Sequence, residues 1–329
     1  MPRIGMNPAR GKKTAFQPAR VTAAVLTYLP NEIGYFQDRF DVTRTCIESI
    51  ITNTHTPYDL MVFDNGSCAR VVDYLREKRD AGQIDFLILS DKNIGKLSAL
   101  KIMFQAAPGT VIAYCDDDIF FLPGWLQTHL KIIDTFPDVG LVSGMYIKSH
   151  MKEGISATIK FGERADVVME RGNLISEEIE NHYMENMGRT RKRYLSEIEG
   201  LEDVRLTHQG ISVFASAGHY QFVAKKNRIL EALPADWNPN LMGEMRALDR
   251  KIDELGYLRV CTTPATLRLL GNQINQKSTQ IIRGYGIDVQ QVKSEQNEKA
   301  SWKARFLRAP LIQKIAYFFY ERLFKIINT

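Results

Sequence analysis

Three consecutive aspartates are the residues of this sequence best suited to chemistry. Asp116, Asp117 and Asp118 follow a short apolar run, 110–115, which is rich in β-branched and aromatic residues and favours a strand buried on both faces. Two unit charges ~4 Å apart repel by roughly 4 kcal/mol at an effective dielectric of 20, so the cluster needs a cation, a basic partner or a shared proton. Mg²⁺ or Mn²⁺ with substrate phosphates is the simplest solution. A solvated acidic turn is the alternative, and a position directly after a buried strand favours the metal site.

The elements that must position these aspartates alternate between strands and helices. Strands are predicted at 21–28, 58–63, 84–89 and 111–115, with helices at 41–53, at 69–79 and up to residue 105. This order predicts right-handed crossovers and a mostly parallel sheet with helices on both faces. Ligands bind such sheets at the carboxyl ends of the strands. The polar clusters at 27–28, 64–67, 93–96 and 116–118 all fall at such ends.

The second half of the chain is less regular. The patterns predict helices at 125–136, 225–233 and 242–255, strands at 139–147, 211–223 and 258–261, and polar segments at 149–210 and 273–292. The polar segment includes a basic cluster of Arg189, Arg191, Lys192 and Arg193, which is more typical of a solvated helix face than of a phosphate site.

Composition indicates a globular protein of one large or two modest domains. The 329 residues are 44% hydrophobic and 25% charged, with a net charge of +5 that suits phosphate-bearing ligands or an anionic membrane surface. The four cysteines lack metal-like or redox spacing, which favours a reduced, cytoplasmic setting. Residues 1–20 are basic without the apolar core of a signal peptide, and we interpret them as a flexible arm. No apolar segment reaches the length needed to span a bilayer.

The last stretch, 302–327, has the pattern of a basic amphipathic helix. Ile312, Ile315, Phe319, Leu323 and Ile326 share one stripe, while basic residues dominate the polar side. Each basic residue near an anionic surface contributes ~1 kcal/mol, so we expect peripheral binding at the inner face of the cytoplasmic membrane. The alternative is a terminal helix that docks on its own domain or on a second subunit.

From about Val21 to Asn272 the sequence resembles the family 2 nucleotide-sugar glycosyltransferases, which are inverting enzymes with the GT-A fold. The most specific part is the DXD motif at 116–118, followed at the family's spacing by Pro123 and Trp125. The resemblance implies a Rossmann-like α/β domain with a nucleotide-binding half, 21–148, and an acceptor half, 149–272. Residues 273–329 would form a C-terminal helical extension.

The resemblance also assigns roles on the donor side. Asp116 would face the ribose and support the metal, Asp118 would bind the metal that bridges the two phosphates, and Asp117 fills the variable position. The remaining donor-side residues match the start of the nucleotide pocket, the aspartate that contacts the base, the turn after the third strand and a cation near the diphosphate. These are Thr27 and Tyr28, Asp64, Asn93 with Gly95, and Lys96, respectively.

The acceptor side matches the family less fully. In the acceptor-site helix Met245 stands where the family has an aspartate, so Glu244 becomes the candidate general base, with Asp249 and Asp236 in reserve. The stretch 266–272 lacks the family's metal-binding histidine, so donor phosphates and water would complete the metal's ligands. The six histidines show no ligand-like spacing and are expected at the surface or in the core: His55, His129, His150, His182, His208 and His219.

The resemblance implies a Mn²⁺- or Mg²⁺-dependent transfer of one sugar, from a UDP-sugar by default, to a glycan or lipid-linked hydroxyl with inversion. The Gln-x-x-Arg-Trp motif of processive synthases is absent, which favours single-sugar transfer. A sugar nucleotidyltransferase is one alternative, although residues 27–34 lack its glycine-rich basic loop. A non-catalytic nucleotide-sugar-binding relative is the other, suggested by Met245. No nucleic-acid partner is expected, and the oligomeric state stays open.

Overall fold

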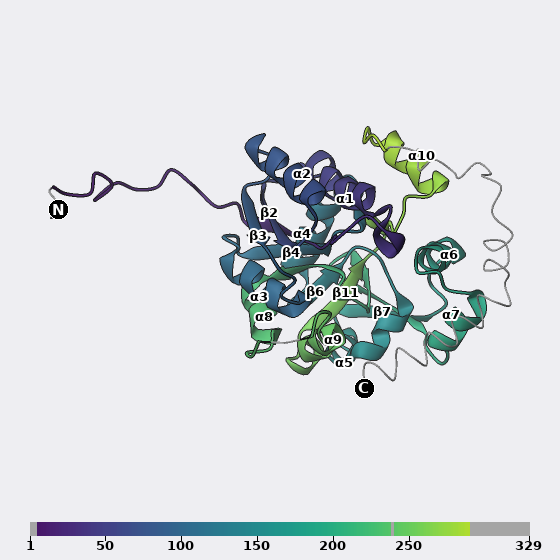
Figure 1. The fold of residues 1–329 in the computed structure, drawn as a ribbon. Coiled ribbons are helices and arrows are strands. Elements are labelled where there is room, and N and C mark those ends of the chain that lie inside the picture. Colours follow the sequence, from purple (N-terminus) through teal and green to yellow (C-terminus); the bar gives the residue numbers. More distant parts are fainter. Residues whose placement is uncertain (1–4, 238–239, 290–329) are drawn as a thin grey trace, which may run out of the picture. The chain divides into compact units, whose positions relative to one another are not determined.

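A computed structural model describes residues 5–237 and 240–289 of the chain. In this part a ten-stranded sheet has helices on both of its faces (Figure 1), and its strand order is β3-β2-β1-β4-β10-β6-β11-β9-β8-β7. The strands are β1 Val21–Thr27, β2 Tyr58–Asn65, β3 Phe86–Ser90, β4 Val111–Asp116, β6 Val139–Ser143, β7 Val167–Gly172, β8 Asp203–His208, β9 Ile211–Phe214, β10 Gln221–Lys225 and β11 Leu258–Thr262. A separate antiparallel pair consists of β5 Ile119–Phe121 and β12 Leu267–Leu269.

The helices connect the strands or extend beyond them. They are α1 Arg39–Asn53, α2 Ala69–Asp80, α3 Lys96–Ala106, α4 Trp125–Thr135, α5 Ser156–Gly162, α6 Glu177–Asn186, α7 Arg191–Glu197, α8 Lys226–Ala232, α9 Met245–Glu254 and α10 Gln276–Gly284, with short 3-10 helices η1 Gly34–Phe36 and η2 Lys148–Glu153. Within the described ranges no helix is both long enough and apolar enough to cross a membrane.

The predicted mostly parallel α/β sheet is confirmed. Strands β3, β2, β1 and β4 are parallel neighbours. Strand β10 is antiparallel to both β4 and β6, so β6 points the same way as β4, and β11 is parallel to β6. The carboxyl ends of these six parallel strands therefore meet at one edge of the sheet.

The core explains why the strands are continuous apolar runs. Along β1, Val21, Ala23 and Val25 pack in a cluster with apolar residues of α1, α2 and α4. Ala24 and Leu26 point to the opposite face, where α3, α8 and α9 supply the partners. Both faces of this strand are buried, as the sequence pattern predicts.

The second half of the chain differs from the prediction in several places. The polar segment 149–210, for which no helix or strand was predicted, contains α5, α6, α7, β7 and β8. The expected strand 211–223 is two strands, because β9 pairs with β11 and β8 whereas β10 pairs with β4 and β6. The chain between them, Ala215–Tyr220, changes position in the sheet. The segment 273–292, expected to be irregular, contains α10, where the Asn275 side chain accepts a hydrogen bond from the Ser278 amide at 2.8 Å. Its Ile282 lies in a small cluster with Phe120.

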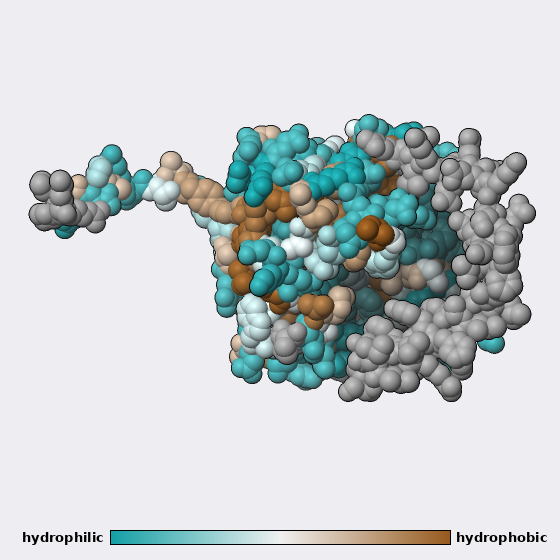
Figure 2. Space-filling model, viewed as in Figure 1, coloured by the Kyte–Doolittle hydropathy of each residue, from teal (hydrophilic) through white to brown (hydrophobic). Residues whose placement is uncertain are grey.

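The two ends of the described chain behave differently. Residues 5–20 contain no helix or strand, but Phe16 packs edge-on against Phe86 of β3, and Figure 2 shows hydrophobic surface where this segment reaches the body. Residues up to Val289 belong to one compact unit. The helix predicted at 302–327 lies outside the described residues.

Candidate functional site

The first polar cluster joins the ends of β1 and β2. Thr27, fully buried, donates a hydrogen bond through its hydroxyl to Asp64 Oδ1 at 3.0 Å. Asp64 Oδ2 accepts from the backbone amides of Gly66 and Ser67 at 3.2 and 3.0 Å. Both Asp64 oxygens are thus engaged in shaping this turn. Tyr28, next in the chain, packs edge-on against Phe36 with ring centroids 6.2 Å apart.

The second cluster ties β2 to the turn before α3. Asn65 donates to Asn93 Oδ1 at 3.0 Å, and the same oxygen accepts from the Gly95 amide at 2.9 Å. Gly95 has a positive φ of 83°, and a Cβ there would lie 2.9 Å from the Asn240 carbonyl oxygen. Only glycine fits this turn without strain. The turn leads directly into Lys96, the first residue of α3.

Lys96, at the start of α3, forms an ion pair with the first of the three aspartates. Its ammonium nitrogen lies 2.6 Å from Asp116 Oδ1, and the side chain of Lys96 is only 12% exposed. The Tyr114 hydroxyl donates to the same Asp116 carboxylate at 2.5 Å. Burial first, and then the negative charge of Asp116, raise the pKa of Tyr114 well above its usual value, so this hydroxyl stays protonated. The carboxylate of Asp116 therefore has two fixed donors.

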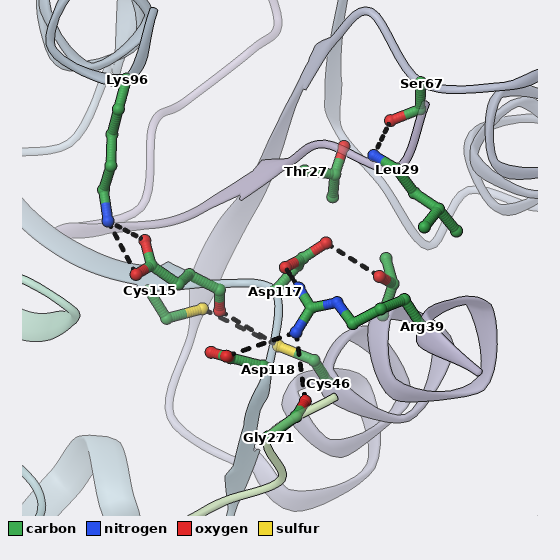
Figure 3. Close-up of polar contacts among 12 residues, drawn as sticks. Thr27, Leu29, Arg39, Cys46, Ser67, Lys96, Cys115, Asp117, Asp118 and Gly271 are labelled. Atoms are coloured by element: carbon green, nitrogen blue, oxygen red, sulfur yellow. Dashed lines mark hydrogen bonds and ion pairs between the residues drawn. The ribbon is translucent and has the colours of Figure 1, made fainter. Parts of the chain in front are cut away.

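Arg39 is the basic partner of the other two aspartates, and Figure 3 shows it reaching all three of its acceptors from the start of α1. Its guanidinium donates to Asp117, to Asp118 Oδ2 at 3.3 Å and to the Gly271 carbonyl at 3.1 Å. Thr43, one turn further along α1, donates to the other oxygen of Asp117 at 2.8 Å. Asp117 is only 5% exposed, so its carboxylate points into the protein and anchors Arg39.

The pKa values reflect this buried ion cluster. Burial lowers the pKa of Arg39, but the attraction of Asp117 and Asp118 outweighs it and leaves that pKa raised. Burial raises the pKa of Asp118 to about 6 despite the opposing effect of Arg39, and the neighbouring carboxylates Asp116 and Asp117 add to the increase. One nearby guanidinium therefore does not fully compensate the charge of Asp118.

A cavity of about 600 Å³ opens beside these residues. Asp116 and Asp118 line it from the end of β4, and His219, Arg246 and Asp249 line it from the second half of the chain. The structure thus brings Asp249, the reserve base, into the same cavity as the two aspartates. Several other charged side chains in its wall form ion pairs, such as Arg246 with Glu153 at 3.4 Å and Arg193 with Glu197 at 3.1 Å.

Glu244 lies elsewhere. It precedes α9 and lines a second cavity, of about 550 Å³, together with residues of α8 and α9 such as Glu231 and Lys251. Glu244 is not among the residues that line the cavity of Asp116 and Asp118. Met245 occupies the place expected for a carboxylate and is buried at 6% exposure in the core. The geometry therefore favours Asp249 over Glu244 on this side of the site.

Asp236, the other reserve candidate for the general base, is exposed, and its backbone carbonyl accepts a hydrogen bond from Lys101.

Sequence reasoning missed two residues of this site. Arg39 is part of no motif, and His219 was expected at the surface or in the core rather than in the site. His219 Nδ1 lies 2.7 Å from Asp249 Oδ2, and the ring shares the cavity with Asp116 and Asp118. The available signal was Gly218 immediately before it, because a glycine within a strand pattern often marks a break.

Of the polar residues around this cavity, only a few are candidates to bind a metal ion. Among the described residues no group of three or more His, Cys, Asp or Glu side chains is placed to hold one. Asp116 and Asp118 share the cavity, and Asp118 Oδ1 has no hydrogen-bond partner in the described part of the chain. Two carboxylates with hard oxygen atoms fit Mn²⁺ or Mg²⁺ when substrate phosphates and water complete the coordination.

Comparisons with known proteins agree on one family. Residues 35–198 match the model for glycosyl transferase family 2. The glucosyl-dolichyl phosphate glucuronosyltransferase of Haloferax volcanii is 26% identical over 115 residues, which cover 34% of this chain and 36% of the relative. An uncharacterized glycosyltransferase of Nostoc sp. is 24% identical over 132 residues, covering 39% and 41%. The chain thus spans about two fifths of the length of these curated relatives.

Two solved structures also resemble this chain at low sequence identity. The mannosyltransferase PcManGT from Pyrobaculum calidifontis, in complex with GDP-Man and Mn²⁺, is 19% identical with a TM-score of 0.41, covering 76% of this chain and 55% of that one. S. aureus TarS 1–349 is 11% identical with a TM-score of 0.44, covering 82% and 66%. With the family model matching residues 35–198, the chain belongs to glycosyl transferase family 2.

Proposed function

We propose that this protein transfers a single sugar from a nucleoside-diphosphate sugar to an acceptor hydroxyl, with inversion at the anomeric carbon. The observation that carries the proposal is the shared cavity: Asp116 and Asp118 at the end of β4 face the same space as Asp249 and His219 from the second half of the chain. Membership of the family supports it. A UDP-sugar is the default donor, and a glycan or lipid-linked glycan is the proposed acceptor.

The donor would lie along the carboxyl ends of β1 to β4, near Thr27, Tyr28, Asp64 and Asn93. Lys96 and Arg39 would offset the negative charge of the diphosphate. Asp118, with Asp116, would hold Mn²⁺ or Mg²⁺. When bound, the ion neutralises charge that develops on the departing diphosphate.

On the acceptor side, a base must take the proton of the attacking hydroxyl as the new bond forms. Direct displacement by that hydroxyl from the face opposite the diphosphate inverts the configuration. Asp249 lines the cavity and Glu244 does not, so the acceptor side is assigned to Asp249 and its partner His219. A non-catalytic sugar-nucleotide-binding relative would bind donor without turnover, which separates it from this proposal.

Donor binding tests the proposal at its first step. Calorimetric titration with UDP and GDP in the presence of Mn²⁺ is expected to detect binding of at least one of them. Asp118→Asn should weaken that binding at least tenfold and reduce its dependence on Mn²⁺, because a ligand of the ion is lost. Asp134→Asn is the matched control, since Asp134 is half exposed and pairs with Arg20 away from the cavity. Failure to bind either nucleotide, with or without Mn²⁺, would contradict the proposal.

We also propose that 302–327 attaches the enzyme to anionic membrane surface, from the sequence pattern alone. Flotation with vesicles containing phosphatidylglycerol should carry the full chain but not a variant lacking 302–329. Equal flotation of both forms would reject this part.

A further inference from the structure

The turn that carries His219 lies beside the aspartates. Strand β10 begins at Gln221, which is paired with Cys115 of β4, and the Asp116 amide donates to the Tyr220 carbonyl at 2.9 Å. Adjacent strands lie about 4.8 Å apart. His219, one residue before this contact, is therefore held next to the end of β4, where its ring enters the cavity that Asp116 and Asp118 line.

Asp249 fixes both the orientation and the tautomer of His219. Asp249 is fully buried, and its Oδ2 lies 2.7 Å from His219 Nδ1. An ionised carboxylate can only accept, so Nδ1 carries the proton and the lone pair is on Nε2. Nε2 has no hydrogen-bond partner among the described residues, and the side chain of His219 keeps 21% of its surface exposed. The ring therefore offers a free acceptor nitrogen to a ligand in the cavity.

Arg259 contacts both Asp249 and the turn that carries His219. It is fully buried on β11, and its guanidinium lies 3.8 Å from Asp249 Oδ2. The same guanidinium donates to the carbonyl of Ala217, two residues before His219, and to that of His150 at 3.4 Å. One side chain thus fixes both the carboxylate and the turn.

His150, a second histidine in the wall of this cavity, lies alongside the ring of His219. The rings of His150 and His219 are nearly parallel, 14° apart with centroids separated by 6.1 Å. Burial lowers the pKa of His150 to about 3, so this ring is neutral at ordinary pH and adds no positive charge beside His219. The other charged groups around the cavity's α9 side, Arg246 and Glu153, pair with each other.

Resting on the proposed function, we propose that His219 is the general base of the transfer and that Asp249 is its positioning residue. The proton of the acceptor hydroxyl passes to His219 Nε2 while the hydroxyl oxygen forms its bond to the anomeric carbon. The bond from that carbon to the diphosphate oxygen breaks, and its electron pair leaves with the nucleoside diphosphate. Asp249 stabilises the imidazolium that results, which provides the acceptor side with a base although Met245 replaces the expected aspartate.

The test measures release of nucleoside diphosphate from UDP-glucose, UDP-N-acetylglucosamine and GDP-mannose with Mn²⁺, with water as the acceptor. His219→Gln should lower kcat about 100-fold or more and leave KM for the donor within about twofold, since a positioned base contributes roughly 10²–10⁴. His55→Gln is the matched control, because His55 is exposed and lines neither cavity. Added imidazole should restore part of the turnover of His219→Ala.

Asp249→Asn separates positioning from a merely structural role. The loss of the carboxylate removes the partner that orients His219 through Nδ1, so kcat should fall and its dependence on pH should change. Calorimetric binding of the nucleoside diphosphate by each variant shows that the donor site is intact. Full turnover by His219→Gln would overturn the inference, as would an Asp249→Asn variant with an unshifted pH profile. Absence of both binding and turnover in the unmutated protein would instead reject the proposed function.

Discussion

Arg39 and Asp117 form a nearly buried ion pair, with side chains 10% and 7% exposed. Replacing Arg39 by Met should lower the free energy of unfolding by about 3–5 kcal/mol, because Asp117 would keep a buried charge without its partner. Urea unfolding measures this change. Arg20→Met is the control: its pair with Asp134 is about half exposed, and the expected loss is below about 1 kcal/mol. Equal losses in the two variants would contradict the assigned role of Arg39.

The sequence predicted that the charges of the three aspartates must be compensated, but it did not show which residues compensate them. A cation, a basic partner or a shared proton was expected, and the structure supplies Arg39 and Lys96. Lys96 could be found because it follows a strand end in the same sheet. Arg39 could not, because it begins a helix and carries no local pattern, and only the tertiary packing brings it to Asp117. His219 was missed although Gly218 precedes it, because a break in a strand pattern does not show which side chains the turn brings together.

Gly218, in the connection 215–220, is the described glycine at which an added Cβ would lie closest to another atom. A Cβ on Gly218 would lie 2.1 Å from the buried Nδ1 atom of His150. Gly218→Ala should therefore displace the turn, lower the melting temperature by several degrees and reduce turnover, as differential scanning calorimetry and the donor assay can measure. Gly284→Ala is the control, because a Cβ there meets nothing within 4 Å. Unchanged stability and turnover in Gly218→Ala would show that the turn can relax.

The element prediction succeeded where hydrophobic periodicity was strong and adjacent strands were consecutive. The first four strands and the helices between them lie close to their expected bounds. The run 211–223 failed because periodicity cannot show that β9 and β10 pair with different neighbours. Helix α10 was missed because its polar sequence hides an apolar side that packs around Phe120.

For the whole molecule, buried histidines predict loss of stability in acid. Burial lowers the pKa of His129 to about 4 and that of His150 to about 3, whereas both would bind protons near pH 6.5 in the unfolded chain. As the pH falls from about 6.5 to 4, the unfolded state takes up protons that the native state does not, so the free energy of unfolding decreases, by ~1.4 kcal/mol per pH unit for His129. The pKa of Asp118 is raised to about 6 in the native state, so this carboxylate takes up its proton in the native state first and offsets part of the decrease. Urea unfolding at pH 7.5, 6 and 4.5 measures the slope, and a stability that stays level or rises would contradict these assignments.

We propose that this molecule releases a nucleoside diphosphate from a nucleotide sugar in the cavity that Asp116, Asp118 and Asp249 line. The most direct measurement is the rate of nucleoside diphosphate release by the full chain from a panel of UDP- and GDP-sugars with Mn²⁺, compared with Asp118→Asn. We expect turnover of at least one donor, with a rate that is lower by about 100-fold or more in Asp118→Asn. Turnover that is unaffected by Asp118→Asn, or absent with every donor, would contradict it.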